Sequence, residues 1–237
     1  IPTAVLGWHA LMHLDEWINP ALISALLNTL WVASIAALIT VFSGIVMVYG
    51  VRLARSDIPK RVLPVTSIGY AAPGAVLGIG LLIPLAWFDN RVADGIWSLI
   101  GIDIGMNLTG TSAAIIYAYC VRFFAIAQGA GDAAMGRVSP NLANAARSLG
   151  RNRVQTLRDV YFPLMRGSIG SALLLVFVDC VKELPATLLL RPFNYNTLAT
   201  LVHEQASLEN LSQAAPASLY IISVGLLAVL FLARTNR

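Results

Sequence analysis

Asn144-Ala145-Ala146-Arg147-Ser148-Leu149-Gly150, continuing to Phe162-Pro163, is the stretch that decides the fold of this chain. It predicts a short amphipathic helix, a turn and a second helix. Ser139-Pro140 marks the start, because serine is a preferred N-cap and proline suits the first helical position. Gly150 stands where the chain must enter the left-handed region to end the first helix. An apolar face is predicted from residues spaced i, i+3, i+4 and i+7, namely Leu142, Ala145, Ala146 and Leu149.

The second helix has its own start signal and its own apolar face. Asn152, followed three residues later by Gln155, resembles a capping box. Pro163 is expected to end this helix, because a proline ring obstructs the preceding turn. The apolar face consists of Val154, Leu157, Val160 and Tyr161. The polar face is left to four arginines, Arg147, Arg151, Arg153 and Arg158.

The composition indicates an integral membrane protein. Of the 237 residues, 57% are hydrophobic and only 12% are charged, whereas soluble domains have about a quarter charged residues. Cys120 and Cys180 both lie inside apolar segments, which predicts small core residues rather than a disulfide or a metal site. The sequence contains no phosphate-binding loop, no paired nucleophile and base and no zinc-protease helix. We therefore predict no catalytic residue, no metal and no cofactor.

Five membrane-crossing segments are predicted, at about 21–51, 62–88, 109–130, 168–190 and 214–233. Residues 1–20 are expected to form a lead-in at the outer membrane interface, because two tryptophans and several polar residues occur there. His9 and His13 are spaced for a metal on one helix face, but two solvated interfacial histidines are the favoured interpretation. Residues 89–108 are expected to form an outer loop, and residues 198–211 an amphipathic helix on the outer leaflet.

Breaks are expected inside the second segment. Pro64, Pro73 and Pro84 interrupt it, together with several glycines. Broken helices are tolerated in membranes where the freed backbone faces protein or water, and such breaks often lie beside a permeation path. Close packing through small residues explains the glycines equally well.

The basic residues predict the orientation. Five crossings with the N-terminus outside and the C-terminus in the cytoplasm place 12 of the 16 lysines and arginines on the cytoplasmic side. The loop 131–167 alone holds six arginines against Asp132 and Asp159. The helix–turn–helix is therefore expected to be cytoplasmic.

A charged cluster is predicted inside the fourth segment. Charges at membrane depth need partners or water. Asp179 lies one turn before Lys182 and Glu183, so that a pair with Lys182 is expected, and Pro185 should kink the helix. By counting residues, Arg122 reaches the same depth as Asp179, which predicts that these two side chains share an ionic network. The cluster is either a translocation path or gate formed by Arg122, Asp179, Lys182, Glu183 and Pro185, or an internal network that fixes helix packing.

The helix–turn–helix resembles the cytoplasmic loop of permease subunits of ABC importers. That loop has Glu-Ala-Ala, three residues, Gly, nine residues, a branched apolar residue, one more residue, and Leu-Pro. The chain keeps this spacing, with Asn for Glu, Val for Ile and Phe for Leu. The resemblance implies that the loop, about 139–163, docks on an ATPase subunit. The residues implied in coupling are Asn144, Ala145, Ala146, Gly150, Arg151, Val160 and Pro163.

Two further stretches resemble the ferric-iron branch of these permeases. They are Tyr70-Ala71-Ala72-Pro73-Gly74 and the run from Lys182-Glu183-Leu184-Pro185 through Arg191-Pro192 to Thr197-Leu198-Ala199-Thr200. The resemblance covers residues 21–237 and implies an all-α membrane domain with the MetI-like permease fold, similar to the second half of a fused permease.

The resemblance also implies a function and partners. The chain would carry ferric iron across a bacterial inner membrane, with ATP hydrolysed by separate cytoplasmic subunits. Its partners would be a periplasmic binding protein, a second permease half and membrane lipid, with no nucleic acid. The same scaffold serves thiamine, sulfate, phosphonate and polyamine importers. A membrane scaffold whose arginine loop only holds a partner or anionic lipids is the alternative from another class.

Overall fold

The computed structural model describes residues 2–54, 56–100 and 108–235, and these residues form helices and connecting turns without strands. Five helical spans are long and apolar enough to cross a membrane: Pro20–Leu53, Gly74–Gly95, Ser112–Gly136, Arg153–Val181 and Leu211–Arg234. The predicted all-α fold with five such spans is therefore confirmed.

The helices follow in the order α1 (Pro2–Met12), α2 (Pro20–Leu53), α3 (Ile58–Val62), α4 (Ile68–Ala71), α5 (Gly74–Ile100), α6 (Ser112–Gly136), α7 (Pro140–Ser148), α8 (Arg153–Thr156), α9 (Phe162–Val181), α10 (Pro185–Leu190), α11 (Leu198–Ser207) and α12 (Leu211–Thr235). Short 3₁₀ helices cover Leu14–Ile18 and Leu63–Ser67, and a π-helical turn covers Leu157–Tyr161.

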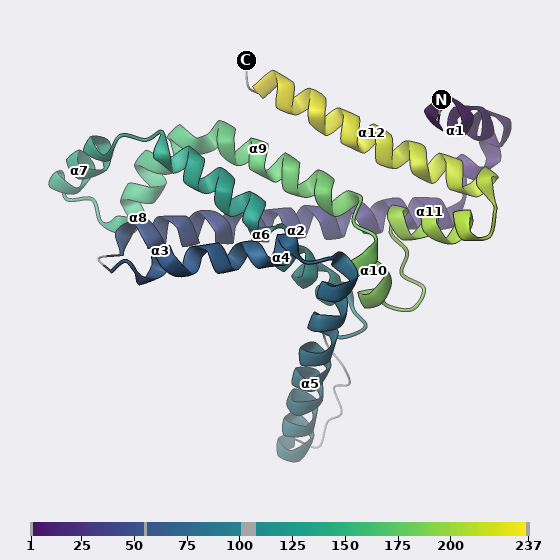
Figure 1. The fold of residues 1–237 in the computed structure, drawn as a ribbon, viewed down its shortest axis with the longest axis horizontal. Helices are drawn as coiled ribbons and strands as arrows, with labels where there is room; N and C mark the ends of the chain where they lie inside the picture. The colour runs from purple at the N-terminus through teal and green to yellow at the C-terminus, as the bar shows by residue number, and fades with distance from the viewer. Residues whose placement is uncertain (1, 55, 101–107, 236–237) are drawn as a thin grey trace.

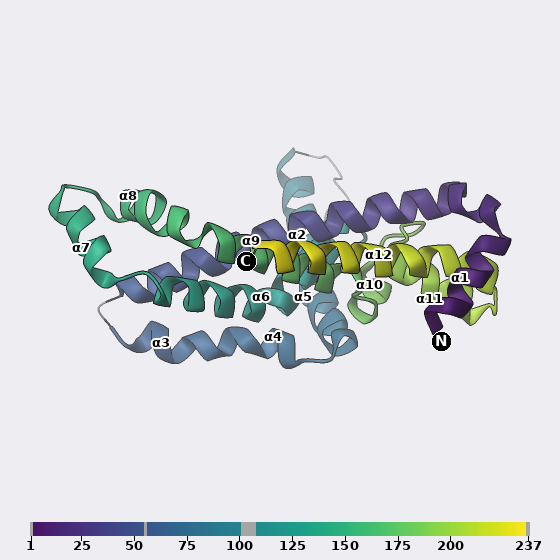
Figure 2. The same cartoon turned by 90° about the horizontal axis from the view of Figure 1, so that it is seen from above.

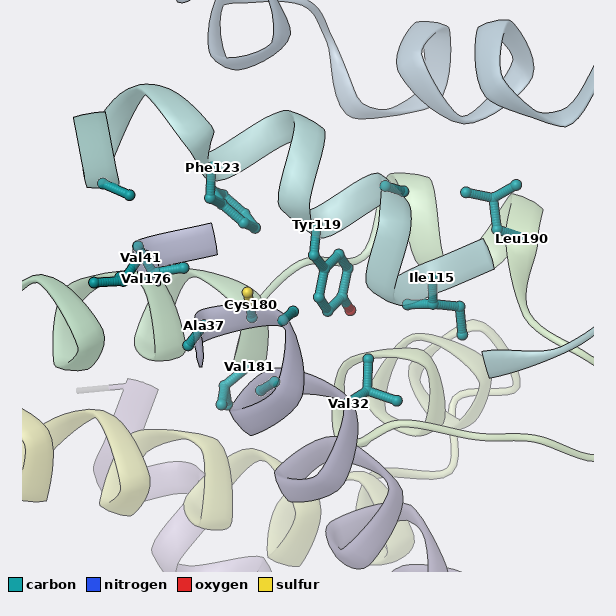
Figure 3. Packing of buried hydrophobic residues seen from close by; sticks show 14 of the residues in the cluster. Val32, Ala37, Val41, Ile115, Tyr119, Phe123, Val176, Cys180, Val181 and Leu190 are labelled. Carbon is teal, nitrogen blue, oxygen red and sulfur yellow. The ribbon is translucent and has the colours of Figure 1, made fainter. Parts of the chain in front are cut away.

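The centre of the molecule is a bundle in which α2, α6 and α9 lie side by side (Figures 1 and 2). Small residues let these helices approach closely, as expected where lipid removes the usual hydrophobic drive between helices. A Cβ atom on Gly44 of α2 would lie only 3.0 Å from the Cβ atom of Ala127 on α6. Figure 3 shows the core layer, in which Tyr119 and Phe123 of α6 pack with Val41 of α2 and Val176 of α9. Cys180 is also buried in this layer and forms no disulfide.

The end of the bundle opposite α7 is closed by α1, α11 and α12. The first helix lies against α12, and Trp17 packs edge-on against Tyr220. The helix predicted on the outer leaflet is α11, but Leu198 and Leu201 are buried against α2 and α12 rather than turned outwards. The Thr29 side chain accepts a hydrogen bond from the backbone N–H of Leu198 at 2.7 Å, which fixes α11 to α2.

The second predicted segment differs from the structure. Residues 58–71 form short helical turns that stop at Ala72-Pro73, and the long helix α5 begins only at Gly74. The cause is Pro73, which has no N–H to donate and forces the preceding residue into an extended conformation. In Figure 1, α5 points away from the bundle and much of its apolar surface is exposed.

The loop predicted at 89–108 is also partly wrong, because residues 89–100 continue α5. Asp89 is buried, and its carboxylate accepts hydrogen bonds from the backbone N–H groups of Leu108 and Thr109. These bonds explain how a buried carboxylate is accommodated inside α5, since it anchors the chain that leads into α6. Asp103 of the predicted loop lies outside the described residues. The third segment ends at Gly136 rather than at residue 130.

The fourth segment was predicted to start after Pro163 and to run to residue 190. Instead the helical backbone runs from Arg153 to Val181, through the π-helical turn just before Pro163. The wider π turn gives the proline ring room, so that the proline does not end the helix. The helix then stops at Val181, and Pro185 begins the separate helix α10 rather than kinking a continuous one.

The orientation of these spans can be measured by cysteine labelling. With Cys120 and Cys180 replaced by alanine, a cysteine at Ser148 should react with a membrane-impermeant maleimide only from the cytoplasmic side. A cysteine at Asp94 should react only from the outer side, because the basic loops are predicted to stay in the cytoplasm. Both positions are exposed, so neither result depends on opening the fold. Labelling of both cysteines from one side would contradict the predicted orientation.

Candidate functional site

The helix–turn–helix forms as the sequence predicts. The Ser139 side chain accepts a hydrogen bond from the backbone N–H of Asn141, and Pro140 occupies the first helical position of α7. Gly150 has a φ of +83°, in the left-handed region. The capping box is complete, because the Asn152 and Gln155 side chains each accept a hydrogen bond from the backbone N–H of the other residue at 2.9 Å.

The apolar face of α7 is largely exposed rather than packed against other helices. The residues of α7 that are buried against the chain are Ala143 and Ala146. Leu142 is 49% exposed and Leu149 is 85% exposed, and Asn144 and Ala145 are also exposed. Three of the four residues of the predicted apolar face, Leu142, Ala145 and Leu149, are therefore exposed. The exposed leucines give the tip of the molecule an apolar surface that no described residue of the chain covers.

The remaining predicted coupling residues lie around α8 and the start of α9. Arg151 pairs with Asp159 at 3.4 Å, and both side chains are largely exposed, so that this pair contributes little to stability. Val160 packs against a buried cluster that we call the tyrosine cluster. Pro163 is exposed in the first turn of α9. The tyrosine cluster comprises Val48, Tyr49, Ala134, Met135, Val138, Ala143, Tyr161 and Met165.

The charged cluster in the bundle is connected differently from the prediction. Arg122 pairs with Glu183, with 3.0 Å between Nε and Oε2, and not with Asp179. Asp179 pairs with Lys182 at 2.7 Å, as the helical spacing predicted. The ion pair of Arg122 is well shielded, since the Arg122 side chain is 20% exposed and the Glu183 side chain 7%.

The end of α9 explains the choice of Glu183. Because the helix stops at Val181, residues 182–184 lie between α9 and α10, and Glu183 stands two residues before Pro185, the first residue of α10. Its carboxylate accepts a hydrogen bond from the backbone N–H of Ala186 at 3.3 Å, in the first turn of α10. Thr187 donates to the Glu183 carbonyl oxygen and lies 2.7 Å from the hydroxyl of Tyr119. Counting depth along an unbroken helix could not reveal this turn.

Arg122 also reaches the other helix break. Its Nη1 atom donates a hydrogen bond to the carbonyl oxygen of Ala72 at 2.9 Å. This carbonyl lies at the break between α4 and α5. Gly74 permits the approach, because a Cβ atom there would lie 2.6 Å from Oε1 of Glu183 and 3.2 Å from Nη1 of Arg122. One arginine on α6 thus joins the breaks at Ala72–Gly74 and at Lys182–Leu184.

Asp179 and Lys182 lie apart from this junction. They line a cavity of about 160 Å³ between α9 and α12, together with Leu175, Ala228 and Leu232. Lys182 is 62% exposed, so that its ammonium group is accessible from outside the bundle. Pro185, by contrast, adjoins the ion pair, since its Cβ atom lies 3.2 Å from the Cβ position that a side chain at Gly74 would occupy. Among the described residues no group of three or more His, Cys, Asp and Glu side chains could hold a metal ion.

The sequence pattern did not identify several residues that form contacts between the helices of these sites. Gln128 of α6 bonds Thr66, and Tyr49 of α2 donates a hydrogen bond to the carbonyl oxygen of Arg153 at 2.7 Å. The sequence indicated a break at Pro73-Gly74, but it did not indicate that Arg122 lies beside it. These contacts join residues far apart in the chain, so that only the packing of the helices reveals them.

The ion pair can be tested by a double-mutant cycle. Arg122→Gln and Glu183→Gln should each lower the unfolding temperature in detergent, because removing one partner of a buried pair costs about 3–5 kcal/mol. The double mutant should be less destabilised than the two losses added, with a coupling energy of about 0.5–3 kcal/mol. The cycle of Arg122→Gln with Asp179→Asn is the matched control and should be additive. Additive losses in the Glu183 cycle would contradict the assigned pair.

No protein-family model matches the chain. The Fe(3+)-transport system permease protein FbpB 2 of Haemophilus influenzae is 26% identical over 84% of this chain and 36% of its own length. The molybdate/tungstate transport system permease protein WtpB of Pyrococcus abyssi is 28% identical over 90% of this chain and 78% of its own length. The chain thus spans about a third of the length of the first relative and most of the second.

Solved structures with a similar fold belong to ABC transporters. A crystal structure of a bacterial alginate ABC transporter, in complex with an alginate-bound periplasmic protein, matches all of this chain and 87% of its own chain, with a TM-score of 0.78 and 17% identity. A structure of the MetNI methionine ABC transporter matches 93% of this chain with a TM-score of 0.59 and 14% identity. The fold is therefore the ABC permease fold, and the chain is a homologue of the permease subunits of ABC importers.

Proposed function

We propose that this chain is one permease half of an ATP-driven importer that moves ferric iron across a bacterial inner membrane. Its N-terminus lies outside and its C-terminus in the cytoplasm. ATP is hydrolysed by a separate subunit that docks on α7, and a periplasmic binding protein delivers the substrate. A second permease half faces this one and completes the path, and membrane lipid surrounds both halves. The chain itself catalyses no reaction and binds no nucleic acid.

The observation that carries this proposal is the exposed tip formed by α7 and α8. Helix α7 is followed by a left-handed glycine and α8 begins with a complete capping box, so local hydrogen bonds and backbone geometry define both helices. Leu142 and Leu149 are nevertheless exposed, beside the basic side chains of Arg147 and Arg151. A rigid apolar surface with a basic rim suits a protein interface. We assign its occupant as the ATPase subunit, because the relatives are permeases of transport systems.

Ferric iron is proposed because two permeases named for ferric transport are among the relatives, one from Haemophilus influenzae and one from Actinobacillus pleuropneumoniae. A 2-aminoethylphosphonate permease from Salmonella typhimurium and the molybdate/tungstate permease are relatives as well. These names supply the competing substrates for the experiment.

The function is tested by transport into proteoliposomes. The full transporter, with its ATPase subunit and binding protein, should take up radiolabelled ferric iron only when ATP is present on the α7 side. Molybdate and 2-aminoethylphosphonate should neither accumulate nor compete, because a binding protein selects its ligand before the permease does. Uptake of either anion instead of iron would overturn the proposed substrate. Failure of any ATPase subunit to bind the chain would overturn the proposed role.

The geometry of Gly150 gives a specific prediction. Valine there would strain the turn by about 1–2 kcal/mol, because a side chain at positive φ meets its own backbone. Gly150→Val should leave membrane insertion intact, reduce co-purification of the ATPase subunit and lower uptake. Gly167→Val is the matched control, since Gly167 lies in α9 with open space around it and no positive φ. Full binding and uptake by Gly150→Val would remove the turn from the coupling role.

A further inference from the structure

The tip formed by α7 and α8 is attached to the bundle by few contacts. Helix α7 packs chiefly on α8 and on the π-helical turn at 157–161, rather than on the long helices. Its buried residue Ala143 enters the tyrosine cluster. Any displacement of the tip must therefore reach the bundle through that cluster or through the backbone on either side.

Tyr49 is the residue of α2 that binds the tip directly. Its hydroxyl donates a hydrogen bond of 2.7 Å to the carbonyl oxygen of Arg153, the first residue of α8. Its ring packs edge-on against Tyr161, with 5.5 Å between ring centroids. Tyr49 is only 7% exposed, whereas Arg153 is exposed, so the hydrogen bond lies at the edge of the buried cluster. The Arg147 guanidinium of α7 is an electrostatic neighbour of the same side chain.

The connection from α8 to α9 is of a different kind. The backbone passes through the π-helical turn at 157–161, directly before Pro163. A π turn has wider hydrogen-bonded rings than an α-helix, and proline removes a further backbone bond, so this junction bends more easily than its neighbours. The attachment of the tip to α9 therefore contains an irregular turn, whereas the attachment through the Tyr49 hydroxyl is a direct contact with α2.

The helix that carries Tyr49 is closely packed on the helix that carries Arg122. Gly44 of α2 meets Ala127 of α6, where a Cβ atom on the glycine would lie 3.0 Å from that of the alanine. Arg52 of α2 also pairs with Asp132 of α6 at 2.9 Å. The two helices are thus closely packed on each other between the tip and the ion pair of Arg122 with Glu183.

We propose that Tyr49 is the positioning residue that makes α2 and α6 follow the α7–α8 tip, while the π-helical turn lets α9 bend. The hydroxyl bond to Arg153 and the ring contact with Tyr161 transmit displacement of the tip along α2 and α6 to Arg122. The inference rests on the proposed function for the source of the displacement. The attachment itself is a property of this chain and is measured without transport.

The test compares two tyrosines that differ in one respect. Tyr49→Phe removes the hydroxyl that bonds Arg153 and keeps the ring contact. Tyr161→Phe removes a hydroxyl for which the structure gives no hydrogen bond and keeps the same ring contact. Spin labels at Ser148→Cys on α7 and Phe42→Cys on α2 report the distance between tip and helix, in nanodiscs and with Cys120 and Cys180 replaced by alanine. Both label sites are exposed.

Pulsed electron resonance should give one narrow distance distribution for the parent chain and for Tyr161→Phe. In Tyr49→Phe, the population of conformers with a longer distance between the labels should increase about fivefold. This is the change expected from the loss of one ordinary hydrogen bond. Labels at Phe42→Cys and Tyr117→Cys, on α2 and α6, should give an unchanged distance, which shows that the bundle is folded. A Tyr49→Phe distribution equal to that of the parent overturns the proposal, and so does equal broadening in both variants.

Transport supplies the functional readout. In the assembled transporter, Tyr49→Phe should bind the ATPase subunit normally and hydrolyse ATP, but it should consume more ATP per ion taken up than the parent. Tyr161→Phe should match the parent. If the parent chain binds no ATPase subunit, the proposed function fails, while the distance measurement still decides the role of Tyr49. Unchanged ATP consumption in Tyr49→Phe, in a parent that transports, overturns the transmission role.

Discussion

The ion pair between Arg122 and Glu183 is the interaction on which the interior of this protein depends. A single charge inside a bilayer is costly, and a buried pair is tolerated only when further hydrogen bonds complete it. Here the two helix breaks supply them. The carbonyl of Ala72 accepts from Arg122, and the N–H of Ala186 donates to Glu183. The breaks therefore stabilise the charges, and the charges satisfy backbone groups that an unbroken helix would have paired internally.

This mutual dependence explains several neighbouring features. Position 74 accommodates only glycine, because Glu183 and Arg122 occupy the space that a side chain would need. Gly78, one turn later, lets Leu189 of α10 pack closely on α5. The short helix α10 is held by the Tyr119–Thr187 contact as well as by its own first turn. A six-residue helix is too short to be stable alone, so its position is set by these tertiary contacts.

Local sequence patterns correctly predicted helix caps and turns. They failed where contacts between distant residues determine the structure. The caps at Ser139 and Asn152 and the turn at Gly150 depend on neighbours within a few residues, and the structure confirms them. The partner of Arg122 depends on where α9 ends. Hydropathy did not reveal this end, because residues 184–190 continue the apolar composition of the helix that precedes them. Pro163 was expected to end a helix, but a π-helical turn accommodated it.

The α7–α8 tip contacts α2 at Tyr49, and the ion pair with Glu183 involves Arg122 of α6. The packing of α2 on α6 therefore limits how the two sites can influence each other. Packed helices shift as bodies between discrete arrangements, because a dense interior does not deform continuously. The close contact of Gly44 with Ala127 and the pair of Arg52 with Asp132 make α2 and α6 such a body. A shift of that body would move Arg122 relative to Ala72 and Glu183, which lie at the two breaks outside α2 and α6. On the proposed role of Tyr49, the hydrogen bonds that complete the ion pair are the contacts that lengthen or exchange when the tip is displaced.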